Sequence, residues 1–331
     1  MKLGCSYFGN RILRHAREDM KELIECGCTF VVHTFSENDL TFCREAVADL
    51  VAMSRELGLE THIDPWGVGK VFGGEAFTNF GLLHPDALQM VSDGRPAAAC
   101  CPNNPQFRAF MREWTDAAAA TGAQVLFWDE PHFYLPHWMG GRPNTWGCCC
   151  AVCRQRFEEM FDKPLPSEPT EEVEQFKERC IIEFLAELAA YGREKGCRNC
   201  LCVLPHGDIE KTTSDWNRFA AIPNLDIFGT DPYWLAAQKD LGYVEAHSRL
   251  VKEVCDAHGL EAQVWLQGFR VPAGREPELA QAADMMVAAG VRNIAVWGFD
   301  ACNHLSWIRP DNPALAWQTI KDTFRRLAGK A

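Results

Sequence analysis

The chain has 331 residues, a formal net charge of -12, and a composition of 47% hydrophobic and 24% charged residues. This composition is typical of a globular protein with enough apolar material for a large core. The acidic balance argues against nucleic acid or an anionic membrane surface as a partner, because both favour basic surfaces. No window of about 18 apolar residues occurs and the N-terminus does not resemble a signal peptide, so we expect a cytoplasmic protein without a membrane partner. A homo-oligomer is compatible with these features.

Short β-branched or aromatic runs alternate with longer amphipathic segments along the whole chain. The runs expected to form strands cover 3–8, 29–35, 60–65, 123–129, 200–206, 225–231, 262–268 and 292–300. The helical patterns cover 11–26, 37–57, 104–121, 170–196, 214–221, 241–258, 276–289 and 312–328. Several of these patterns end in a C-capping glycine, as at Gly58, Gly122 and Gly259. The alternation predicts an α/β fold, a single (β/α)8 TIM barrel that spans residues 1–331 as one domain.

Two long segments follow predicted strand ends. A glycine-rich stretch, 66–77, follows the third strand, and we expect a mobile rim loop there. An insertion at 130–168, rich in proline and cysteine, follows the fourth strand. Barrel enzymes place their active sites at the C-terminal ends of the strands, so both segments are expected to border the site.

Acidic and aromatic residues gather at the predicted strand ends. Asp129 and Glu130 are adjacent at the end of the fourth strand, and both can face the barrel mouth only if the strand ends between them. The other candidate ligands are His33, Asp64, Trp66, His206, Asp231, Tyr233, Trp234, Trp265, Gln267, Trp297 and Asp300. Carboxylates that bind hydroxyl groups, together with Trp and Tyr rings that stack on sugar faces, favour a carbohydrate substrate.

Each candidate also has a structural interpretation. Asp64 and Asp231 each precede a proline and would serve equally as turn caps. His33 and His206 would serve equally as hydrogen-bonded supports. About half of the tryptophans are expected to belong to the core instead of the site.

Four cysteines have the spacing of a metal site. Cys148, Cys150 and Cys153 form a C-x-C-x-x-C pattern, and Cys101 lies upstream. Four thiolates complete a tetrahedral shell, so a zinc ion here would be structural and would fix the insertion to the barrel. The alternative is free thiols in a reducing compartment, which the 16 cysteines of a chain without an export signal also allow.

Residues 95–165 resemble glycoside hydrolase family 42 β-galactosidases. The resemblance rests on CPNNPQFR (101–108), an acid-ending fourth strand, the C-x-C-x-x-C pattern and RQRFEEMF (154–161). It implies a structural zinc on the cysteines and Glu130 as the acid/base. In that family a glutamate at the end of strand seven is the nucleophile, whereas VWLQGF places Gln267 there. A glutamine cannot attack the anomeric carbon, so the nucleophile must come from elsewhere.

The Asp-Glu-Pro triplet at 129–131 resembles the Asp-Glu motif of β-N-acetylhexosaminidases of families 20 and 123. That resemblance implies substrate-assisted catalysis, in which the substrate acetamido oxygen attacks C1. Asp129 would then orient the acetamido group, Glu130 would protonate the leaving oxygen, and Tyr233 or Gln267 would donate to the acetamido oxygen. We therefore expect an exo-acting β-N-acetylhexosaminidase, because long rim loops admit chain ends more easily than chain middles.

Three alternatives remain open. One is a galactosidase-like hydrolase in which Asp129 is the nucleophile and Asp231 the acid/base, a layout similar to α-galactosidase-type barrels. A second is a metal-dependent sugar isomerase or epimerase with Asp64, Glu130, His206 and Asp231 around a divalent ion. The third is a barrel that binds sugar without catalysis.

Overall fold

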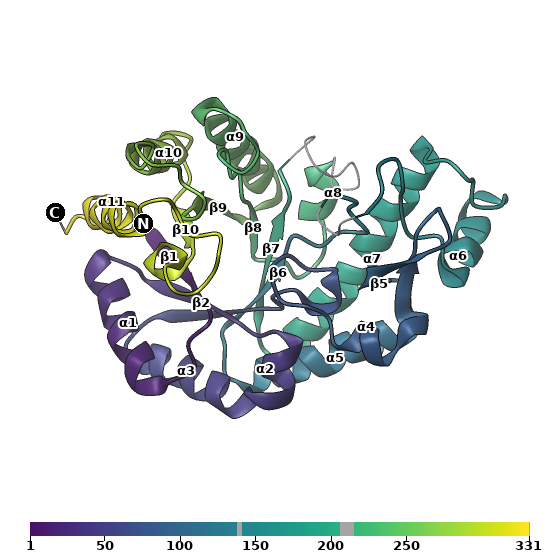
Figure 1. Cartoon of the computed structure of the whole chain (residues 1–331), viewed down its shortest axis with the longest axis horizontal. Coiled ribbons are helices and arrows are strands. Elements are labelled where there is room, and N and C mark those ends of the chain that lie inside the picture. The colour runs from purple at the N-terminus through teal and green to yellow at the C-terminus, as the bar shows by residue number, and fades with distance from the viewer. Residues whose placement is uncertain (138–140, 206–214, 331) are drawn as a thin grey trace.

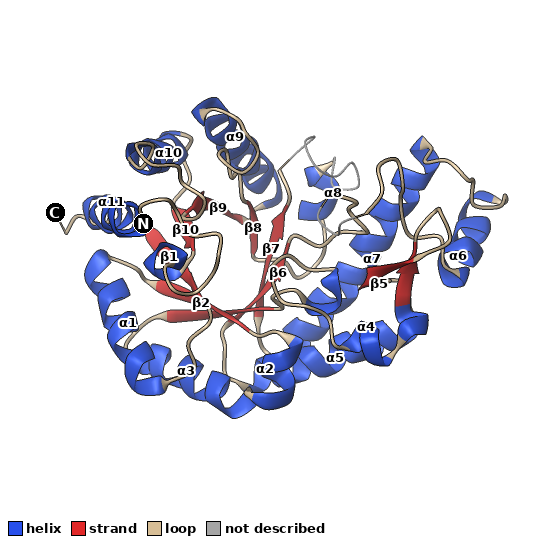
Figure 2. Ribbon diagram, in the orientation of Figure 1, coloured by secondary structure: helices blue, strands red, loops and turns tan. Residues whose placement is uncertain are grey.

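Eight parallel strands close into a barrel in the computed structural model, which describes residues 1–137, 141–205 and 215–330. The strands follow the order β1-β10-β9-β8-β7-β6-β3-β2 around the barrel, with helices outside them (Figures 1 and 2). They are β1 (Lys2–Tyr7), β2 (Phe30–Thr34), β3 (Glu60–Asp64), β6 (Val125–Asp129), β7 (Arg198–Val203), β8 (Ile227–Thr230), β9 (Glu261–Gln267) and β10 (Asn293–Trp297). The predicted (β/α)8 barrel is confirmed.

The helices that follow the strands match the predicted segments closely. They are α1 (Leu13–Cys26), α5 (Pro105–Ala120), α7 (Glu171–Glu194), α8 (Trp216–Ala220), α9 (Leu241–His258), α10 (Pro277–Ala288) and α11 (Pro313–Leu327). The segment predicted as one helix at 37–57 is two helices, α2 (Glu37–Phe42) and α3 (Arg44–Glu56), interrupted at Cys43. A capping box between Ser36 and Asp39 starts α2 and fixes its direction.

Strand alternation divides the core into an inner and an outer layer. Phe30 on β2, Phe127 on β6 and Trp265 on β9 lie in the cluster that fills the barrel. Their strand neighbours, such as Val31 and Leu126, belong to the cluster beneath the helices. Because successive side chains point to opposite faces, a side chain reaches the barrel mouth only if it has the inward parity.

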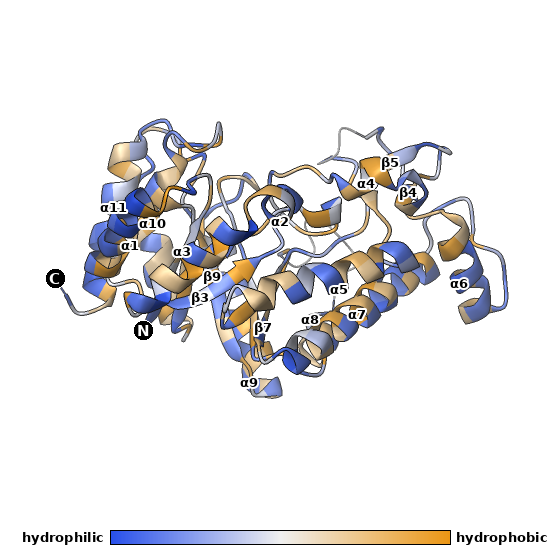
Figure 3. Cartoon of the chain, turned by 90° about the horizontal axis from the view of Figure 1, so that it is seen from below, coloured by the Kyte–Doolittle hydropathy of each residue, from blue (hydrophilic) through white to orange (hydrophobic). Residues whose placement is uncertain are grey.

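Two strand-end connections build a lobe beside the barrel. After β3 come a 3-10 turn η1 (Val68–Lys70), α4 (Phe80–Leu83), η2 (Pro85–Ala87) and an antiparallel pair, β4 (Leu88–Met90) and β5 (Pro96–Cys100). After β6 comes α6 (Ala151–Phe161). Figure 3 shows α6, β4 and β5 at the end of the long axis opposite α1 and α11. The β4–β5 pair lies in a segment for which the sequence predicted no strand.

The helices carry their apolar residues on the faces turned to the barrel. On α5, Phe107, Met111 and Trp114 are buried, and Figure 3 shows orange and blue residues interleaved along α5 and α7. Within the described residues, no helix has both the length and the apolar character needed to cross a membrane.

Candidate active site

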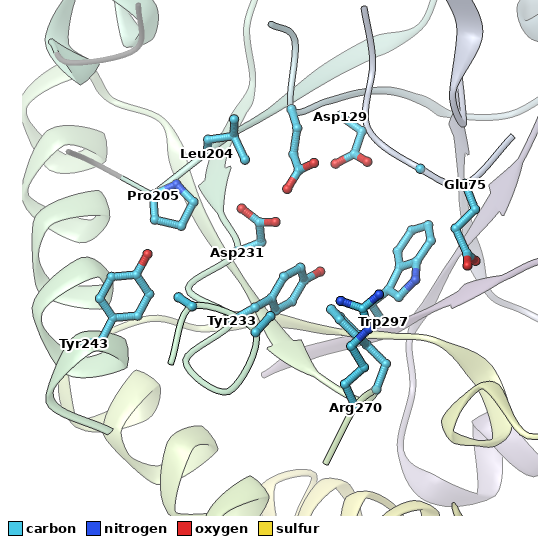
Figure 4. A pocket seen from close by; sticks show the side chains of 14 residues that line it. Glu75, Asp129, Leu204, Pro205, Asp231, Tyr233, Tyr243, Arg270 and Trp297 are labelled. Carbon is cyan, nitrogen blue, oxygen red and sulfur yellow. The ribbon is translucent and has the colours of Figure 1, made fainter. Parts of the chain in front are cut away.

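A cavity of about 330 Å³ opens at the C-terminal ends of the strands, where barrels carry their active sites. Residues from five strand ends and the glycine-rich loop line it: Gly74, Glu75, Asp129, Glu130, Leu204, Pro205, Asp231, Tyr233, Ala236, Ala237, Tyr243, Phe269, Arg270 and Trp297. Figure 4 shows the carboxylates of Asp129 and Asp231 directed into the same space, with the ring of Tyr233 beside them.

Asp129 and Glu130 both line the cavity because the strand ends between them. Asp129 is the last residue of β6 and points inward by parity. Glu130 has a positive φ of 39°, an unfavourable conformation for a residue with a side chain, and its N–H donates to the Cys202 carbonyl at 2.9 Å. That turn brings a second carboxylate to the face that Asp129 already occupies.

The glycine-rich loop forms one wall of the cavity and is hydrogen-bonded to the end of β6. The Gly73 N–H donates to the Asp129 carbonyl at 3.0 Å, and the Gly67 N–H donates to the Gly73 carbonyl at 2.6 Å. A Cβ on Gly73 would lie 2.6 Å from Asp129 Oδ2 and 2.6 Å from Glu130 Oε2. A Cβ on Gly74, whose φ is +107°, would lie 1.9 Å from the Trp66 ring. Glycine is needed at both positions because the backbone packs directly on the acids and on that ring.

Glu37 on α2 anchors this loop from behind. Its side chain is only 3% exposed. Its carboxylate accepts hydrogen bonds from the Gly69 N–H at 2.8 Å, the Thr78 hydroxyl at 2.9 Å and the Phe80 N–H at 2.6 Å. These three hydrogen bonds to a buried carboxylate hold the backbone on both sides of Gly73 and so fix the position of the loop against Asp129 and Glu130.

Three aspartates around the cavity have raised pKa values. Burial raises the pKa of Asp129 well above its usual range, and the charges of Asp64 and Glu130 raise it further. Burial likewise raises the pKa of Asp231, with added contributions from the charge of Glu130 and a hydrogen bond with it. Carboxyl groups whose burial and neighbours oppose ionisation keep their protons to higher pH than exposed ones.

Asp64 lies beneath this group. It ends β3 with inward parity and is fully buried, and neither carboxylate oxygen has a hydrogen-bond partner. Burial raises the pKa of Asp64, and the charge of Glu130 adds to the effect. Asp64 does not line the cavity.

Tyr233 and Trp297 supply the aromatic surface of the cavity. Tyr233 lies edge-on to Phe269, with ring centres 4.9 Å apart, and follows Asp231 by two residues. Trp297 ends β10 and stacks on Phe8 at 5.4 Å between ring centres. Burial and then the charge of Asp231 raise the pKa of the Tyr233 hydroxyl, so this group remains a hydrogen-bond donor.

Several residues predicted to bind substrate lie elsewhere. His33 has outward parity on β2, is 1% exposed, and its Nε2 lies 3.0 Å from the Ser54 hydroxyl on α3. Trp265 points into the barrel core and donates to Gln263, while Trp234 lies under α10 and donates to Glu278. Strand alternation explains the position of His33, because strand-end position alone does not decide which way a side chain points.

Gln267, Trp66 and Asp300 also lie outside the cavity lining. The Gln267 oxygen accepts from the N–H groups of Leu235 and Ala236 at 3.0 and 3.3 Å, and its Nε2 donates to the Phe269 carbonyl at 2.9 Å. Gln267 is thus a buried residue that contacts the backbone of two loops at the mouth of the barrel. Trp66 packs between Phe8 and Gly74, and Asp300 lies toward α1 and α11, where Glu22 is among its neighbouring charges. His206 lies outside the described residues.

Two charged lining residues were not among the sequence candidates. Glu75 comes from the glycine-rich loop and accepts from the Ser306 hydroxyl at 2.6 Å. Arg270 lies three residues beyond Gln267, and its guanidinium lies 4.4 Å from the ring centre of Trp307. Neither residue lies at a strand end, because each belongs to a loop that folds back over the mouth of the barrel.

The four cysteines of the predicted metal site come together. Their sulfur atoms all lie within 4.8 Å of one another, with Cys101 Sγ 3.4 Å from Cys153 Sγ and 3.8 Å from Cys150 Sγ. Zinc–sulfur bonds of about 2.3 Å in a tetrahedron place sulfurs about 3.8 Å apart, so the set fits zinc. The neighbouring Cys149 lies outside the set. A metal here would join the start of α6 to the residue that follows β5, and so would tie the two long connections to each other.

No family model matches the chain, and no curated protein matches its sequence. Among solved structures, the chain is similar to a β-galactosidase from Bacillus circulans sp. alkalophilus, with a TM-score of 0.71 and 11% identity, over 99% of this chain and 56% of that one. It is also similar to a GH5_18 protein from Bifidobacterium longum in complex with Manβ1-4GlcNAc, with a TM-score of 0.59 and 15% identity, over 100% and 78%. The chain is also similar to a 3-keto-D-glucoside 4-epimerase from E. coli, with a TM-score of 0.50 and 12% identity, over 99% of this chain and 98% of that one. At these identities the likeness establishes the TIM-barrel fold.

Proposed function

We propose that the protein is an exo-acting glycoside hydrolase that removes β-linked N-acetylhexosamine by substrate-assisted catalysis. The observation that carries this proposal is the arrangement of Asp129 and Glu130. Both line one cavity, and an oxygen of each lies 2.6 Å from the same point beside Gly73. The two oxygens are therefore no farther apart than twice that distance. Two acids this close to each other can both contact one bound sugar.

The roles follow from the chemistry of each group. Glu130 donates its proton to the glycosidic oxygen as the bond to C1 breaks, and it later removes a proton from the water that attacks C1. Asp129 accepts a hydrogen bond from the acetamido N–H, which turns the acetamido oxygen toward C1 as the nucleophile. Tyr233, a donor in the same cavity, is placed to bind that oxygen.

Gln267 supports this mechanism over a pair of protein carboxylates on β6 and β9. Its amide oxygen accepts from two backbone N–H groups and its Nε2 donates to a backbone carbonyl, and an amide is not a nucleophile toward the anomeric carbon. The structural neighbours that act on glycosides support hydrolysis of a glycosidic bond, but they do not indicate which sugar is removed. One of them, the GH5_18 protein, was solved in complex with a disaccharide that contains GlcNAc, which agrees with an acetamido sugar.

A galactosidase-like mechanism is the second candidate, because Asp231 lines the same cavity and burial, together with the charge of Glu130, raises its pKa. In that case Asp129 would attack C1 and Asp231 would be the acid/base, and no acetamido group would be required. A metal-dependent isomerase is less well supported. Within the described part of the chain, only the cysteines bring three or more metal-ligand atoms within 4.8 Å of one another.

A panel of nitrophenyl glycosides tests the proposal. We expect hydrolysis of the β-N-acetylglucosaminide or β-N-acetylgalactosaminide, inhibition by the corresponding thiazoline, and loss of activity in Asp129→Asn. Hydrolysis of α- or β-galactosides without any activity on acetamido sugars would favour the second candidate and would overturn the first.

A further inference from the structure

One side of the cavity carries a cation that the hydrolytic mechanism does not use. Of the 14 lining residues, Glu75, Asp129, Glu130 and Asp231 are acidic, and Arg270 is the one basic residue. Figure 4 shows Arg270 near Trp297, on the side of the cavity away from Tyr243 and Pro205. A single arginine in such an acidic cavity favours an anionic ligand group at that one place.

The guanidinium of Arg270 is held in place without an acidic partner. It lies 4.4 Å from the centre of the Trp307 ring, a cation–π contact that orients its plane. Across residues 1–137, 141–205 and 215–330, no carboxylate forms an ion pair with it. Arg270 also has a φ of 46°, and its N–H donates to the Ile308 carbonyl at 2.6 Å. The backbone therefore adopts an unfavourable conformation in which two loops jointly present this side chain.

The position of the pair suggests which part of a substrate it meets. Arg270 is exposed at the rim, and Trp307 beside it is 78% exposed. Asp129 and Asp231 lie deeper, at the ends of their strands. In an exo-acting enzyme the sugar to be removed occupies the deep end, so the rim contacts the leaving group. An exposed indole next to a guanidinium offers a stacking surface and a donor fork at that point.

We propose that Arg270 and Trp307 form a subsite for an acidic sugar on the leaving-group side of the bond. The anionic substituent is a carboxylate or a sulfate ester, which the guanidinium binds through paired N–H donors. The assignment of this subsite to the leaving group rests on the proposed function. The binding of an anion by Arg270 does not depend on it. The substrate class is then an N-acetylhexosamine β-linked to a uronic acid or to a sulfated sugar.

Binding can be measured without any hydrolysis. Titration calorimetry with D-glucuronate, D-glucose 6-sulfate and D-glucose compares two anionic sugars with a neutral one. We expect one or both anions to bind at least about tenfold more tightly than D-glucose, and Arg270→Gln to remove the difference. The two anions distinguish a carboxylate site from a sulfate site. Arg309→Gln, an exposed arginine on the Trp307 loop that does not line the cavity, is the matched control and is expected to retain the preference.

Hydrolysis tests the same subsite separately. N-acetylglucosamine β-linked to D-glucuronate should be cleaved with a kcat/KM at least about tenfold above that for the same sugar linked to D-glucose, and Arg270→Gln should bring the ratio near one. Anion binding without cleavage of any glycoside would uphold the subsite and overturn the proposed function. Equal binding of anionic and neutral sugars in the wild-type protein would overturn the subsite, whatever the enzyme hydrolyses.

Discussion

The backbone N–H of Gly73 donates to the carbonyl oxygen of Asp129 at 3.0 Å, so the glycine-rich loop is fixed to the last residue of β6. This bond brings the loop against the carboxylates of both Asp129 and Glu130. A segment that the sequence predicts as a rim loop thus packs against the carboxylates of the candidate site. Its position depends in turn on Glu37, a buried residue on the other side of the loop.

Gly73→Ala tests this contact. The added methyl group would lie 2.6 Å from an oxygen of each acid, so one or both carboxylates must move. We expect kcat to fall by about a hundredfold, because small displacements of catalytic groups have effects of that order. Gly94→Ala is the control: its Cβ meets open space, and its positive φ costs only about 1 kcal/mol of stability. Equal kcat values in the two variants would contradict the role given to Gly73.

Asp64→Asn tests the buried acid below the cavity. The raised pKa of Asp64 means that folding opposes its ionisation, so the penalty is absent at a pH below its unfolded value and grows as pH rises through the range up to the folded value. We expect the variant to gain at least about 1 kcal/mol in free energy of unfolding at pH 7.5 and much less at pH 4, measured by urea denaturation. Asp49→Asn, an exposed residue, should change stability little at either pH. Destabilisation of Asp64→Asn at pH 7.5 would show that its charge is stabilised by the fold.

Gln267→Glu tests whether a carboxylate at the end of β9 can act as a nucleophile. A carboxylate would replace the amide that donates to the Phe269 carbonyl and would place two acceptors against each other. We expect a loss of about 1–3 kcal/mol in stability and no gain in hydrolysis of any glycoside. A variant that cleaves galactosides faster than the wild-type protein would show that residue 267 reaches the substrate.

Metal content tests the cysteine cluster. We expect one equivalent of zinc in the purified protein, and a lower melting temperature after chelation or in Cys153→Ser. Cys149→Ser is the matched control, since this buried cysteine neighbours the cluster but lies outside it. The same melting temperature and zinc content in Cys153→Ser and the wild-type protein would contradict a structural zinc.

The barrel was predictable because its evidence is local and repeated. Each strand is a short apolar run, each helix an amphipathic segment, and several glycines mark the transitions. The adjacent acids at 129 and 130 were recognisable for a similar reason, since one strand end accounts for both. The cysteine spacing likewise brought together residues from two connections.

The direction of side chains and the contacts between distant segments could not be predicted from the sequence. His33 was one residue away from inward parity, so it packs on α3 instead of entering the mouth. Gln267 has a favourable strand-end position, but two backbone N–H groups of the loop after β8 bind its side chain. Glu75 and Arg270 reach the cavity only because their loops fold back across it. No local pattern encodes those paths, which depend on contacts between segments distant in the sequence.

The most direct test of the proposed function is the effect of Glu130→Gln on substrates with different leaving groups. Glu130 protonates the leaving oxygen, so its loss should matter most when that oxygen is basic. For N-acetylglucosamine β-linked to a hydroxyl group of a second sugar, we predict a fall in kcat of at least about a hundredfold. The fall should be clearly smaller for the nitrophenyl glycoside, whose leaving oxygen is less basic. An equal fall for both substrates, or wild-type activity in Glu130→Gln, would contradict Glu130 as the acid/base.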